Sequence, residues 1–427
     1  MADIVIFYEL PERELNNAYL LKAEFERRGY SVDIKDYWNY HEILFPIKEK
    51  PKLVIAHSGY DNSDLERFTV RFRPKIDKML NMRYEQVIAD RILNSTLHYP
   101  REYLKNMSFI CWSEHIKEEM MKQGIPEKNL PVTGDIKTDF SNERFDSFYK
   151  TKEELGEEFG LNSQKEWILF ISSFTFDEYD TDDRLIRLNN NLEDGKYMQK
   201  WDIKSKEIFM DWVRKFLESH PEKEFIYRPH PTENSAVNED IAISALNKEY
   251  SNFHYIGKYA IQEWVRPCDY LNTCLSTSVI DVYLLKKQCN ILRPVPLNPD
   301  FDNPLLIHAD YIDSYEEFEK ANTIKSDNPF PISDEDVNKY YYFGDKLAYE
   351  YICDYAEKMI ADDSFKSDFY PGNPTFSRLK FMIKKSLAMP KGIPTVFKSA
   401  LKNKSIHKTE MESADMNEEK INKIIKG

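Results

Sequence analysis

The sequence predicts an α/β fold with two Rossmann-like domains, each a parallel sheet covered by helices. Short apolar runs alternate with segments whose apolar residues recur at helical spacing, which is the pattern of βαβ units. This alternation occurs twice, over residues 4–135 and 167–292, with a polar, charged stretch between them. At 427 residues the chain is too long for one ordinary core and suits two domains with an appendage.

In the first half, Leu15, Ala18, Leu21 and Phe25 give a helix its apolar face, and Gly29 ends it. Residues 86–90 are ambiguous between strand and loop. We expect helices at residues 12–28 and 115–123, and strands at residues 4–8, 31–34, 52–56, 108–112 and 130–133.

The second half repeats the pattern after a polar segment, residues 142–162, which contains a helix near 152–159 and is expected to link the domains. We expect strands at residues 167–172, 225–227, 253–256, 270–275 and 290–292, and helices at residues 203–219, 238–249, 261–266 and 279–286. A further long helix is expected at residues 340–359, with an apolar stripe of Tyr341, Phe343, Leu347, Tyr351 and Tyr355.

Composition and charge limit the class of protein. The formal charge of −14 argues against a general nucleic-acid binder. The five cysteines are scattered without a C-x-x-C pair, which favours a reducing compartment and argues against a structural zinc site. The first residues lack the basic region and long apolar core of a signal peptide. No run approaches the roughly eighteen apolar residues of a membrane span. We therefore expect a cytoplasmic protein.

The C-terminal stretch differs from the rest in charge. Residues 378–408 contain nine Lys and Arg and no Asp or Glu, interleaved with apolar side chains. This pattern predicts an amphipathic helix on an anionic membrane surface, or a helix docked on the acidic body of the chain. The last residues, 409–427, are polar and are expected to be mobile.

Two motifs suggest a phosphate site. Arg228-Pro229-His230-Pro231 follows the apolar run 225–227, and Ser276, Thr277 and Ser278 stand where a helix is expected to begin. A cation, an imidazole and hydroxyl groups at strand ends and helix starts suit a phosphate diester, because ligands of open α/β sheets collect there. Taken singly, His-Pro is also a common turn and Ser-Thr-Ser a common helix cap.

These motifs together resemble a known family. Arg228 to Pro231, Ile261-Gln262-Glu263-Trp264, and Ser276 to Ser278 followed by Leu284-Leu285-Lys286-Lys287 resemble the C-terminal half of GT-B glycosyltransferases that make bacterial surface polysaccharides. Glu24 to Tyr30, Asn81 to Gln86 and Trp112 to Asp135 resemble their N-terminal half. The chain is similar to the surface carbohydrate biosynthesis proteins and, more distantly, to bacterial Kdo transferases, polysialyltransferases and CDP-glycerol glycerophosphotransferases.

The resemblance implies a site for a cytidine nucleotide. His230, Ser276, Thr277 and Ser278 become donor contacts, and Arg228 becomes a second phosphate partner or an ion pair that supports the loop. Ser172 and Ser173 are expected near the phosphates, although ordinary capping also explains them. Glycine is scarce, with 12 residues, which favours a nucleoside monophosphate donor over a diphosphate.

The base that activates the acceptor is expected in the N-terminal domain. Glu85 is the first candidate, and Glu14 and Asp61 are alternatives; each carboxylate has an ordinary surface or capping role as its rival. Arg13 is expected to hold an anionic acceptor or to pair with Glu14. His230 is expected to stabilise the leaving phosphate without a metal.

No metal is expected. Acidic stretches at residues 180–183, 300–302 and 334–336 are interpreted as solvated charge, and His57, His98 and His115 are too dispersed to suggest a metal site. No cofactor is expected beyond the nucleotide-sugar donor, which is a substrate.

The sequence thus predicts a GT-B glycosyltransferase with two Rossmann-like domains facing across a cleft and a C-terminal helical appendage. Its expected partners are a CMP-linked sugar, a glycan or lipid-linked acceptor and the inner face of the plasma membrane. Rival functions are a CDP-alditol phosphotransferase, a UDP-sugar 2-epimerase and a non-catalytic subunit of a polysaccharide assembly complex. The expected parts are an acceptor domain (1–141), a linker (142–162), a nucleotide-sugar domain (163–339), a helical segment (340–377) and a basic amphipathic tail with a mobile end (378–427).

Overall fold

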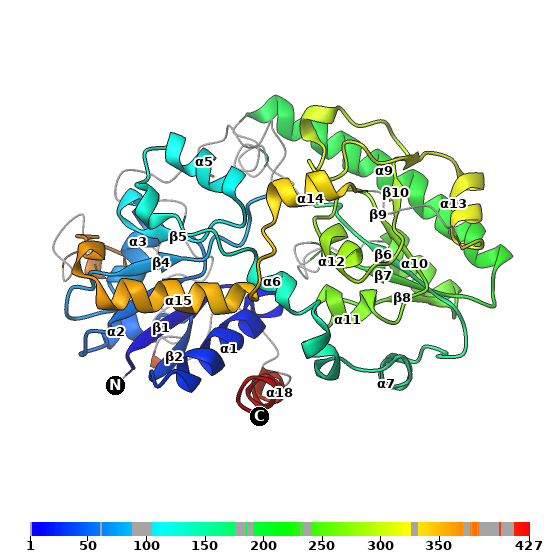
Figure 1. The fold of residues 1–427 in the computed structure, drawn as a ribbon. Coiled ribbons are helices and arrows are strands. Elements are labelled where there is room, and N and C mark those ends of the chain that lie inside the picture. Colours follow the sequence, from blue (N-terminus) through cyan, green and yellow to red (C-terminus); the bar gives the residue numbers. More distant parts are fainter. Residues whose placement is uncertain are drawn as a thin grey trace. The chain divides into compact units, whose positions relative to one another are not determined.

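The chain folds into two compact units, shown in Figure 1. Unit 1 comprises Met1–Gln86, Leu97–Asp139 and Asn338–Gly427, and unit 2 comprises Val87–Thr96 and Phe140–Val337, as far as these ranges are described. The computed structural model describes residues 2–59, 62–87, 104–175, 185, 191–230, 233, 241–325, 332–369, 376, 378–381, 383, 401–402 and 414–427.

Unit 1 is built on a parallel sheet in the order β2-β1-β3-β4-β5. Its strands are β1 (Ile4–Tyr8), β2 (Val32–Asp36), β3 (Leu53–Ala56), β4 (Met79–Asn81) and β5 (Ser108–Phe109). Its helices are α1 (Pro11–Arg27), α2 (His41–Leu44), α3 (Asn62–Thr69), α5 (Glu114–Lys122), α6 (Ile136–Asp139), α15 (Ala348–Ala361) and α18 (Ala414–Lys426). The sequence did not predict β4, and the strand expected at 130–133 is wrong, because Val132 forms only an isolated bridge with Cys111.

Helix α1 follows the predicted pattern. Pro11 occupies its first turn, where a missing N–H costs nothing. Leu15, Ala18, Leu21 and Phe25 are buried, as their spacing predicts. After the helix the chain turns at Gly29, whose φ of +91° lies in the region that glycine adopts without steric cost.

The prediction of one long helix at residues 340–359 is wrong for the first part of that range. Residues 341–347 are not helical, and the structure has α14 (Asp334–Tyr340) and then α15. The carboxylate of Asp139 accepts hydrogen bonds from the backbone N–H groups of Ala348 and Tyr349, both at 2.8 Å, and so begins α15 there. The buried face of α15 is therefore a different one from the predicted stripe: Tyr349, Ile352, Cys353, Ala356 and Met359.

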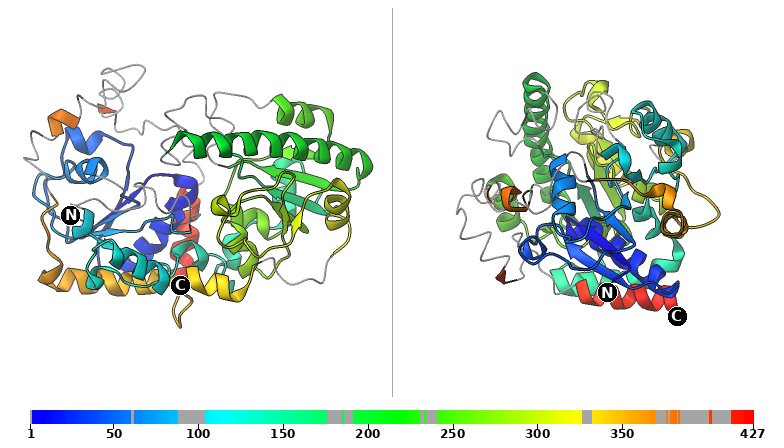
Figure 2. Two further views of the ribbon diagram at one scale, coloured as in Figure 1. Left: turned by 90° about the horizontal axis from the view of Figure 1, so that it is seen from above. Right: turned by 90° about the vertical axis from the view of Figure 1, so that its left-hand side faces the viewer.

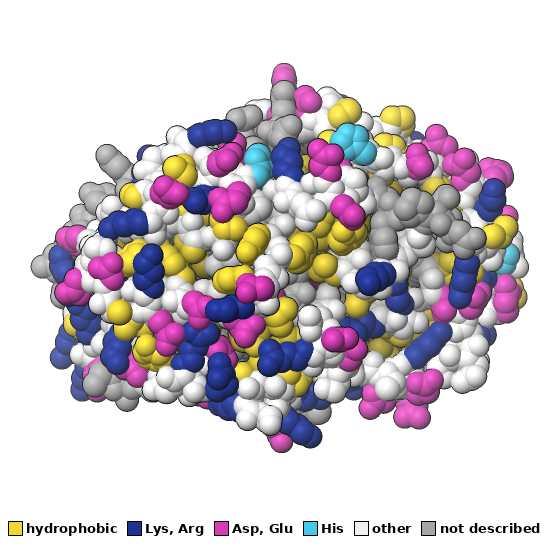
Figure 3. Space-filling model, in the orientation of Figure 1, with side chains coloured by type: hydrophobic (Ala, Val, Ile, Leu, Met, Phe, Trp, Pro, Cys, Tyr) yellow, Lys and Arg dark blue, Asp and Glu magenta, His cyan; other side chains and the backbone are white. Residues whose placement is uncertain are grey.

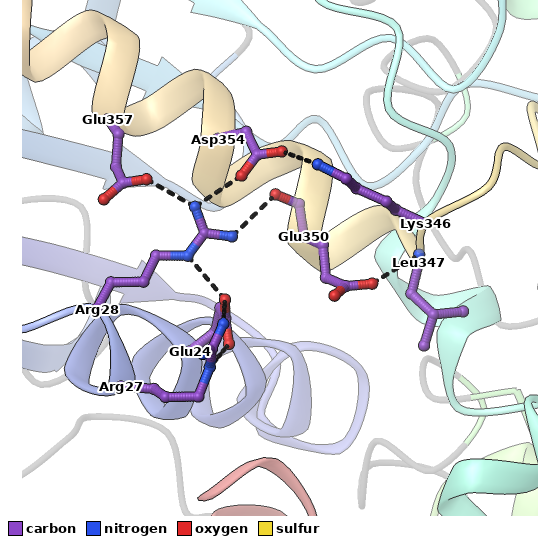
Figure 4. Close-up of polar contacts among 8 residues, drawn as sticks. All are labelled: Glu24, Arg27, Arg28, Lys346, Leu347, Glu350, Asp354 and Glu357. Atoms are coloured by element: carbon purple, nitrogen blue, oxygen red, sulfur yellow. Dashed lines mark hydrogen bonds and ion pairs between the residues drawn. The ribbon is translucent and has the colours of Figure 1, made fainter.

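Arg28, directly after α1, ties α1 to α15 (Figure 4). Its guanidinium donates to Glu24, Asp354 and Glu357, each at 2.7 Å. The side chain of Arg28 is only 15% exposed, and that of Glu24 is 2% exposed. One buried cation therefore joins two helices that are more than three hundred residues apart in the chain.

The C-terminal helix α18 packs on α1, where the sequence predicted a mobile end (Figure 2). Ile421 and Ile425 are buried. Asn417 donates to Asn16 at 3.1 Å, Lys426 pairs with Glu26 at 2.7 Å, and Lys22 pairs with Glu418. Polar composition misled the prediction, because the two buried isoleucines and these three polar contacts together hold α18 on α1.

Unit 2 contains a parallel sheet in the order β11-β10-β9-β6-β7-β8. Its strands are β6 (Trp167–Ile171), β7 (Glu224–Arg228), β8 (Phe253–Tyr255), β9 (Tyr270–Thr273), β10 (Asn290–Leu292) and β11 (Tyr311–Ile312). Its helices are α7 (Lys152–Phe159), α9 (Leu192–Ser219), α10 (Ile241–Glu249), α11 (Ile261–Val265), α12 (Val279–Leu284) and α13 (Tyr315–Ala321). The chain also has 3₁₀ turns at Leu104–Asn106, Glu127–Asn129, Glu143–Phe148, Pro299–Phe301 and Asp363–Phe365.

Helix α9 runs along the sheet of unit 2 (Figure 2) and begins eleven residues earlier than expected. The side chain of Asn191 accepts a hydrogen bond from the backbone N–H of Asp194 at 2.7 Å, which caps the helix at that point. The ring of Phe209 lies 4.1 Å from that of Phe170 in β6, and Trp212, Val213 and Phe216 extend this buried contact.

The surface carries both signs of charge. Lys and Arg side chains are interspersed with Asp and Glu over the face drawn in Figure 3. Among the described residues, no helix is long and apolar enough to cross a membrane.

Candidate functional site

Both sheets have a topological switch point, and the candidate residues gather at these two places. In unit 2, β6 lies between β7 and β9, and the sheet continues in opposite directions from it. This is the Rossmann strand order, in which ligands bind outside the carboxyl ends of the strands beside the switch point. Unit 1 has the flavodoxin-like order, with its switch point between β1 and β3.

Three loops meet at the carboxyl edge of the sheet in unit 2. Ser172 and Ser173 follow β6, His230 follows β7, and Ser276, Thr277 and Ser278 follow β9. The hydroxyl of Ser173 accepts a hydrogen bond from the backbone N–H of Leu275 at 3.0 Å, which joins the first loop to the third. The predicted motifs, although up to a hundred residues apart, therefore share one edge of the sheet.

The hydroxyl loop is built by short local hydrogen bonds. The backbone N–H of Ser276 donates to the Thr273 hydroxyl at 3.3 Å, and that of Ser278 donates to the Ser276 hydroxyl at 3.2 Å. Thr277 is exposed, and Ser276 and Ser278 are half-buried. All three can thus be reached from solvent, which a ligand-binding role requires.

Glu233 organises the His-Pro loop and was not among the residues that the sequence singled out. Its carboxylate accepts the backbone N–H of His230 at 2.6 Å and the Tyr227 hydroxyl at 3.0 Å, and the Tyr227 oxygen also lies within hydrogen-bond distance, 3.1 Å, of the Ser172 hydroxyl. Lys206 of α9 lies 3.7 Å away. Burial raises the pKa of Glu233 to about 7, although the charge of Lys206 lowers it. The signal in the sequence was an acid three residues after His230.

Arg228 and Ser172 are buried and form hydrogen bonds to backbone groups near these loops. The guanidinium of Arg228 donates to the backbone carbonyls of Ile256, at 3.3 Å, and Tyr259, and the side chain is 8% exposed. Ser172 is 2% exposed and accepts from the backbone N–H of Phe174 at 3.3 Å. The Arg228 contacts described here are to backbone carbonyls, whereas the sequence suggested an ion pair as its supporting role, and the phosphate-binding roles of Arg228 and Ser172 stay predictions.

In unit 1 the candidates lie after β1 and after β4. The guanidinium of Arg13 pairs with Glu85 at 3.1 Å, and their side chains are 34% and 49% exposed. Arg13 was expected to hold the acceptor or pair with Glu14; it forms an ion pair with Glu85, the first candidate base, and its charge also opposes the rise in the pKa of Glu14. Asp61 lies outside the described residues.

Glu14, the residue after Arg13, is buried, with 4% of its surface exposed. Its carboxylate accepts backbone N–H groups from Glu9 at 2.6 Å and Leu10 at 3.4 Å. Burial raises its pKa to about 7, against these hydrogen bonds and the charge of Arg13. Glu9, Glu14 and His57 bring one ligand atom each within 4.8 Å of one another. The sequence analysis judged the histidines by their distance from one another. It therefore did not find this group, in which the other two members are carboxylates.

One acidic stretch was misread. Asp302 is not solvated charge: it is 4% exposed and pairs with the buried Arg293 at 2.6 Å. In the stretch 334–336, Asp334 accepts the Tyr283 hydroxyl at 2.5 Å and Asp336 pairs with His308 at 3.1 Å. Residues 180–183 lie outside the described part of the chain.

Two parallel α/β units of the Rossmann type, each with polar side chains at its switch point, define the class of fold. Among solved structures, the wall teichoic acid polymerase TagF is similar at 12% identity and a TM-score of 0.52, covering 84% of this chain and 88% of that one. UDP-GlcNAc 2-epimerase from Neisseria meningitidis, bound to UDP-GlcNAc, is similar at 13% identity and a TM-score of 0.50, covering 83% and 99%. No protein-family model matches the chain. No curated protein matches it either.

The chain therefore has a GT-B type of fold, and the predicted α/β class with two Rossmann-like domains is confirmed.

Proposed function

We propose that the protein is a GT-B glycosyltransferase that moves a sugar from a CMP-linked donor to a glycan or lipid-linked acceptor in bacterial surface polysaccharide synthesis. The observation that supports this proposal is that the loops with His230 and with Ser276, Thr277 and Ser278 follow strands at the same carboxyl edge of a Rossmann-ordered sheet, beside its switch point. An imidazole and several hydroxyls at such an edge suit a nucleotide phosphate.

Each residue has a role in this proposal. His230 stabilises the leaving phosphate, and the three hydroxyls hold the nucleotide. Ser172, Ser173 and Arg228 fix the loops, as their hydrogen bonds to Tyr227, Leu275 and backbone carbonyls suggest. Glu85 is the general base: its exposed carboxylate can be reached by an acceptor hydroxyl, and Arg13 orients it. The acceptor then belongs to residues 1–141 and the donor to residues 163–339.

Neighbouring functions on the same fold are the alternatives that an experiment must separate. The similar solved structures are a teichoic acid polymerase and an epimerase bound to UDP-GlcNAc, so alditol-phosphate transfer and sugar epimerisation both stay open. The nucleotide distinguishes the three.

The test is thermal denaturation with CMP, CDP, UMP, UDP or GDP. A ligand that binds only the native state raises its stability by RT ln(1 + [L]/Kd), about 2.7 kcal/mol at a hundredfold excess over Kd. We expect CMP to give the largest shift, and His230→Ala to remove it. His308→Ala is the matched control in the same unit, because the side chain of His308 is 70% exposed and pairs with Asp336.

A larger shift with CDP would replace sugar transfer by alditol-phosphate transfer, and a larger shift with UDP would point to an epimerase or a hexosyltransferase. No shift with any nucleotide, or equal shifts in both histidine variants, would overturn the proposal. A transfer assay on His230→Ala, with circular dichroism to verify folding, should show no activity.

We also propose that residues 378–408 hold the protein at an anionic membrane surface, which would bring it to a lipid-linked acceptor. The support is the charge of this segment, with nine Lys and Arg and no acid, and its apolar side chains.

A further inference from the structure

A buried group of two carboxylates and one imidazole lies at the switch point of unit 1. Glu9 and Glu14 follow β1, and His57 follows β3, the strand beside it. One ligand atom from each residue lies within 4.8 Å of the others, and the His57 Nδ1 to Glu9 Oε2 distance is 3.5 Å. His57 is 2% exposed and Glu14 is 4% exposed. Glu9 is 28% exposed, so an ion can reach the group from solvent on the side of Glu9.

The imidazole of His57 lacks the hydrogen bonds that a buried ring needs. Among the described residues, neither of its two ring nitrogens has a hydrogen-bond partner. The rings of Tyr37 and Phe68 pack against it, with centroids 4.4 and 5.6 Å away. Burial, with the charges of Arg67 and Arg71, lowers its pKa to about 3, so the ring is neutral at physiological pH and has a lone pair to offer.

The surrounding charges leave this group negative. The described charges that act most strongly on Glu9 are those of Asp64, Arg67, Glu85 and Arg13. With Glu9 and Glu14 themselves, four carboxylates face two guanidiniums, and Arg71 beyond them is paired with Glu42 at 3.3 Å. The pKa values of Glu9 and Glu14 are both raised, chiefly by burial, in spite of these cations. With Glu9 and Glu14 included, acidic side chains therefore outnumber basic ones among these groups.

We propose that Glu9, Glu14 and His57 bind one divalent transition-metal ion, of the zinc, manganese or cobalt class. Carboxylate oxygen and neutral imidazole nitrogen are the ligands that such ions share, whereas magnesium prefers oxygen alone. Ligands about 2.1 Å from a tetrahedral ion lie about 3.4 Å from one another, close to the distance between His57 and Glu9. The ion would join the turn after β1 to the end of β3, and its fourth position would stay open for water or an acceptor hydroxyl.

The test is metal binding by untagged protein that has been treated with a chelator and then dialysed against Zn²⁺, Mn²⁺ or Co²⁺. We expect one ion per chain by elemental analysis, a d–d absorption band for Co²⁺, and a rise in Tm on adding metal. Glu9→Gln should weaken binding at least tenfold and remove the rise in Tm. Because Glu9 is partly exposed and Gln keeps its shape, this variant is expected to fold. His57→Gln is the second variant, verified by circular dichroism.

Glu12→Gln is the matched control: Glu12 is an exposed acid on the first turn of the same helix, and its variant should bind metal as the parent does. Absence of binding would overturn the proposal and leave buried water as the partner of His57. Equal binding by the parent and Glu9→Gln would overturn it as well. The nucleotide shifts tested above concern unit 2, so failure of either proposal can be told from failure of the other.

Discussion

At the scale of single residues, Glu14 is a carboxyl that the fold holds away from water. Its pKa is raised from an ordinary 4.5 to about 7 by burial. Between these two pH values the native state binds more protons than the unfolded chain, so the free energy of unfolding falls as pH rises. The full difference corresponds to about 3 kcal/mol above pH 7.

Glu14→Gln should therefore stabilise the metal-free protein by about 3 kcal/mol at pH 8 and have little effect near pH 4.5, because the amide keeps an acceptor for the N–H groups of Glu9 and Leu10. Urea unfolding in the presence of chelator, at both pH values, measures this. The exposed Glu12→Gln should change stability by less than about 0.5 kcal/mol at either pH. An equal effect of Glu14→Gln at both pH values would contradict the buried, protonated carboxyl.

Glu233 gives the second prediction at this scale. Glu233→Ala leaves the His230 N–H without its acceptor, at a cost of about 1–3 kcal/mol, whereas the Tyr227 hydroxyl can still donate to Ser172. We expect a loss of stability of about 2 kcal/mol and nucleotide binding at least tenfold weaker, because the His-Pro loop loses the carboxylate that holds its backbone in place. Glu233→Gln should recover most of the binding. Isothermal titration with CMP measures both variants, and unchanged affinity in Glu233→Ala would show that the loop holds its shape alone.

Single residues also show which parts of the candidate site could be predicted from the sequence. His230 and the serines were found because they follow apolar runs, and parallel strands bring such positions to one edge. The group of Glu9, Glu14 and His57 was missed because its members come from two elements, and only the pairing of β1 with β3 brings them together. Likewise, the partner of Arg13 proved to be Glu85, which lies 72 residues further along the chain.

At the scale of elements, the prediction succeeded for α1, whose apolar residues recur at helical spacing, and for β6 and β7, which are buried along their whole length and follow from apolar runs in the sequence. It failed at residues 341–347, because the cap that begins α15 comes from Asp139, which lies 209 residues earlier. No local pattern contains that information. It also failed for α18, where polar composition hid a contact with α1 at the other end of the chain.

The bridge from Arg28 to α15 makes a prediction for these elements. Arg28→Ala removes hydrogen bonds to Glu24, Asp354 and Glu357 and leaves the buried Glu24 with Arg27. Charged hydrogen bonds of this kind contribute about 1.5–3 kcal/mol. We expect amide hydrogen exchange in α15 to accelerate about tenfold or more, with little change in unit 2. Lys346→Ala is the control, since Lys346 is 48% exposed and its ion pair is with Asp354, and it should leave exchange nearly unchanged.

At the scale of the whole molecule, the segment near the C-terminus differs from the rest of the chain in its charge and also exposes apolar side chains. The chain carries a net charge of −14, yet residues 378–408 have no acid. Phe381 is buried against Tyr40, Ile43 and Val70, and Arg378 donates to the Val70 carbonyl at 2.8 Å, so residues 378–381, at the start of this segment, are attached to unit 1. Phe376, Leu379 and Ile383 are 70%, 61% and 50% exposed. Their spacing puts them on a helix face other than that of Phe381.

A membrane surface would cover that face. Burying an exposed leucine or isoleucine in an apolar phase contributes about 1.5–3 kcal/mol, and each basic side chain near an anionic surface adds about 1 kcal/mol. The double variant Leu379→Glu with Ile383→Glu should therefore pellet at least tenfold less with phosphatidylglycerol vesicles than the parent. The parent itself should bind less in 0.5 M salt, because salt screens the basic residues. Ile203→Glu with Ile324→Glu is the matched control, since these isoleucines of unit 2 are 50% and 59% exposed. If both double variants pellet like the parent, residues 376–383 do not contact lipid, and the basic segment serves another surface.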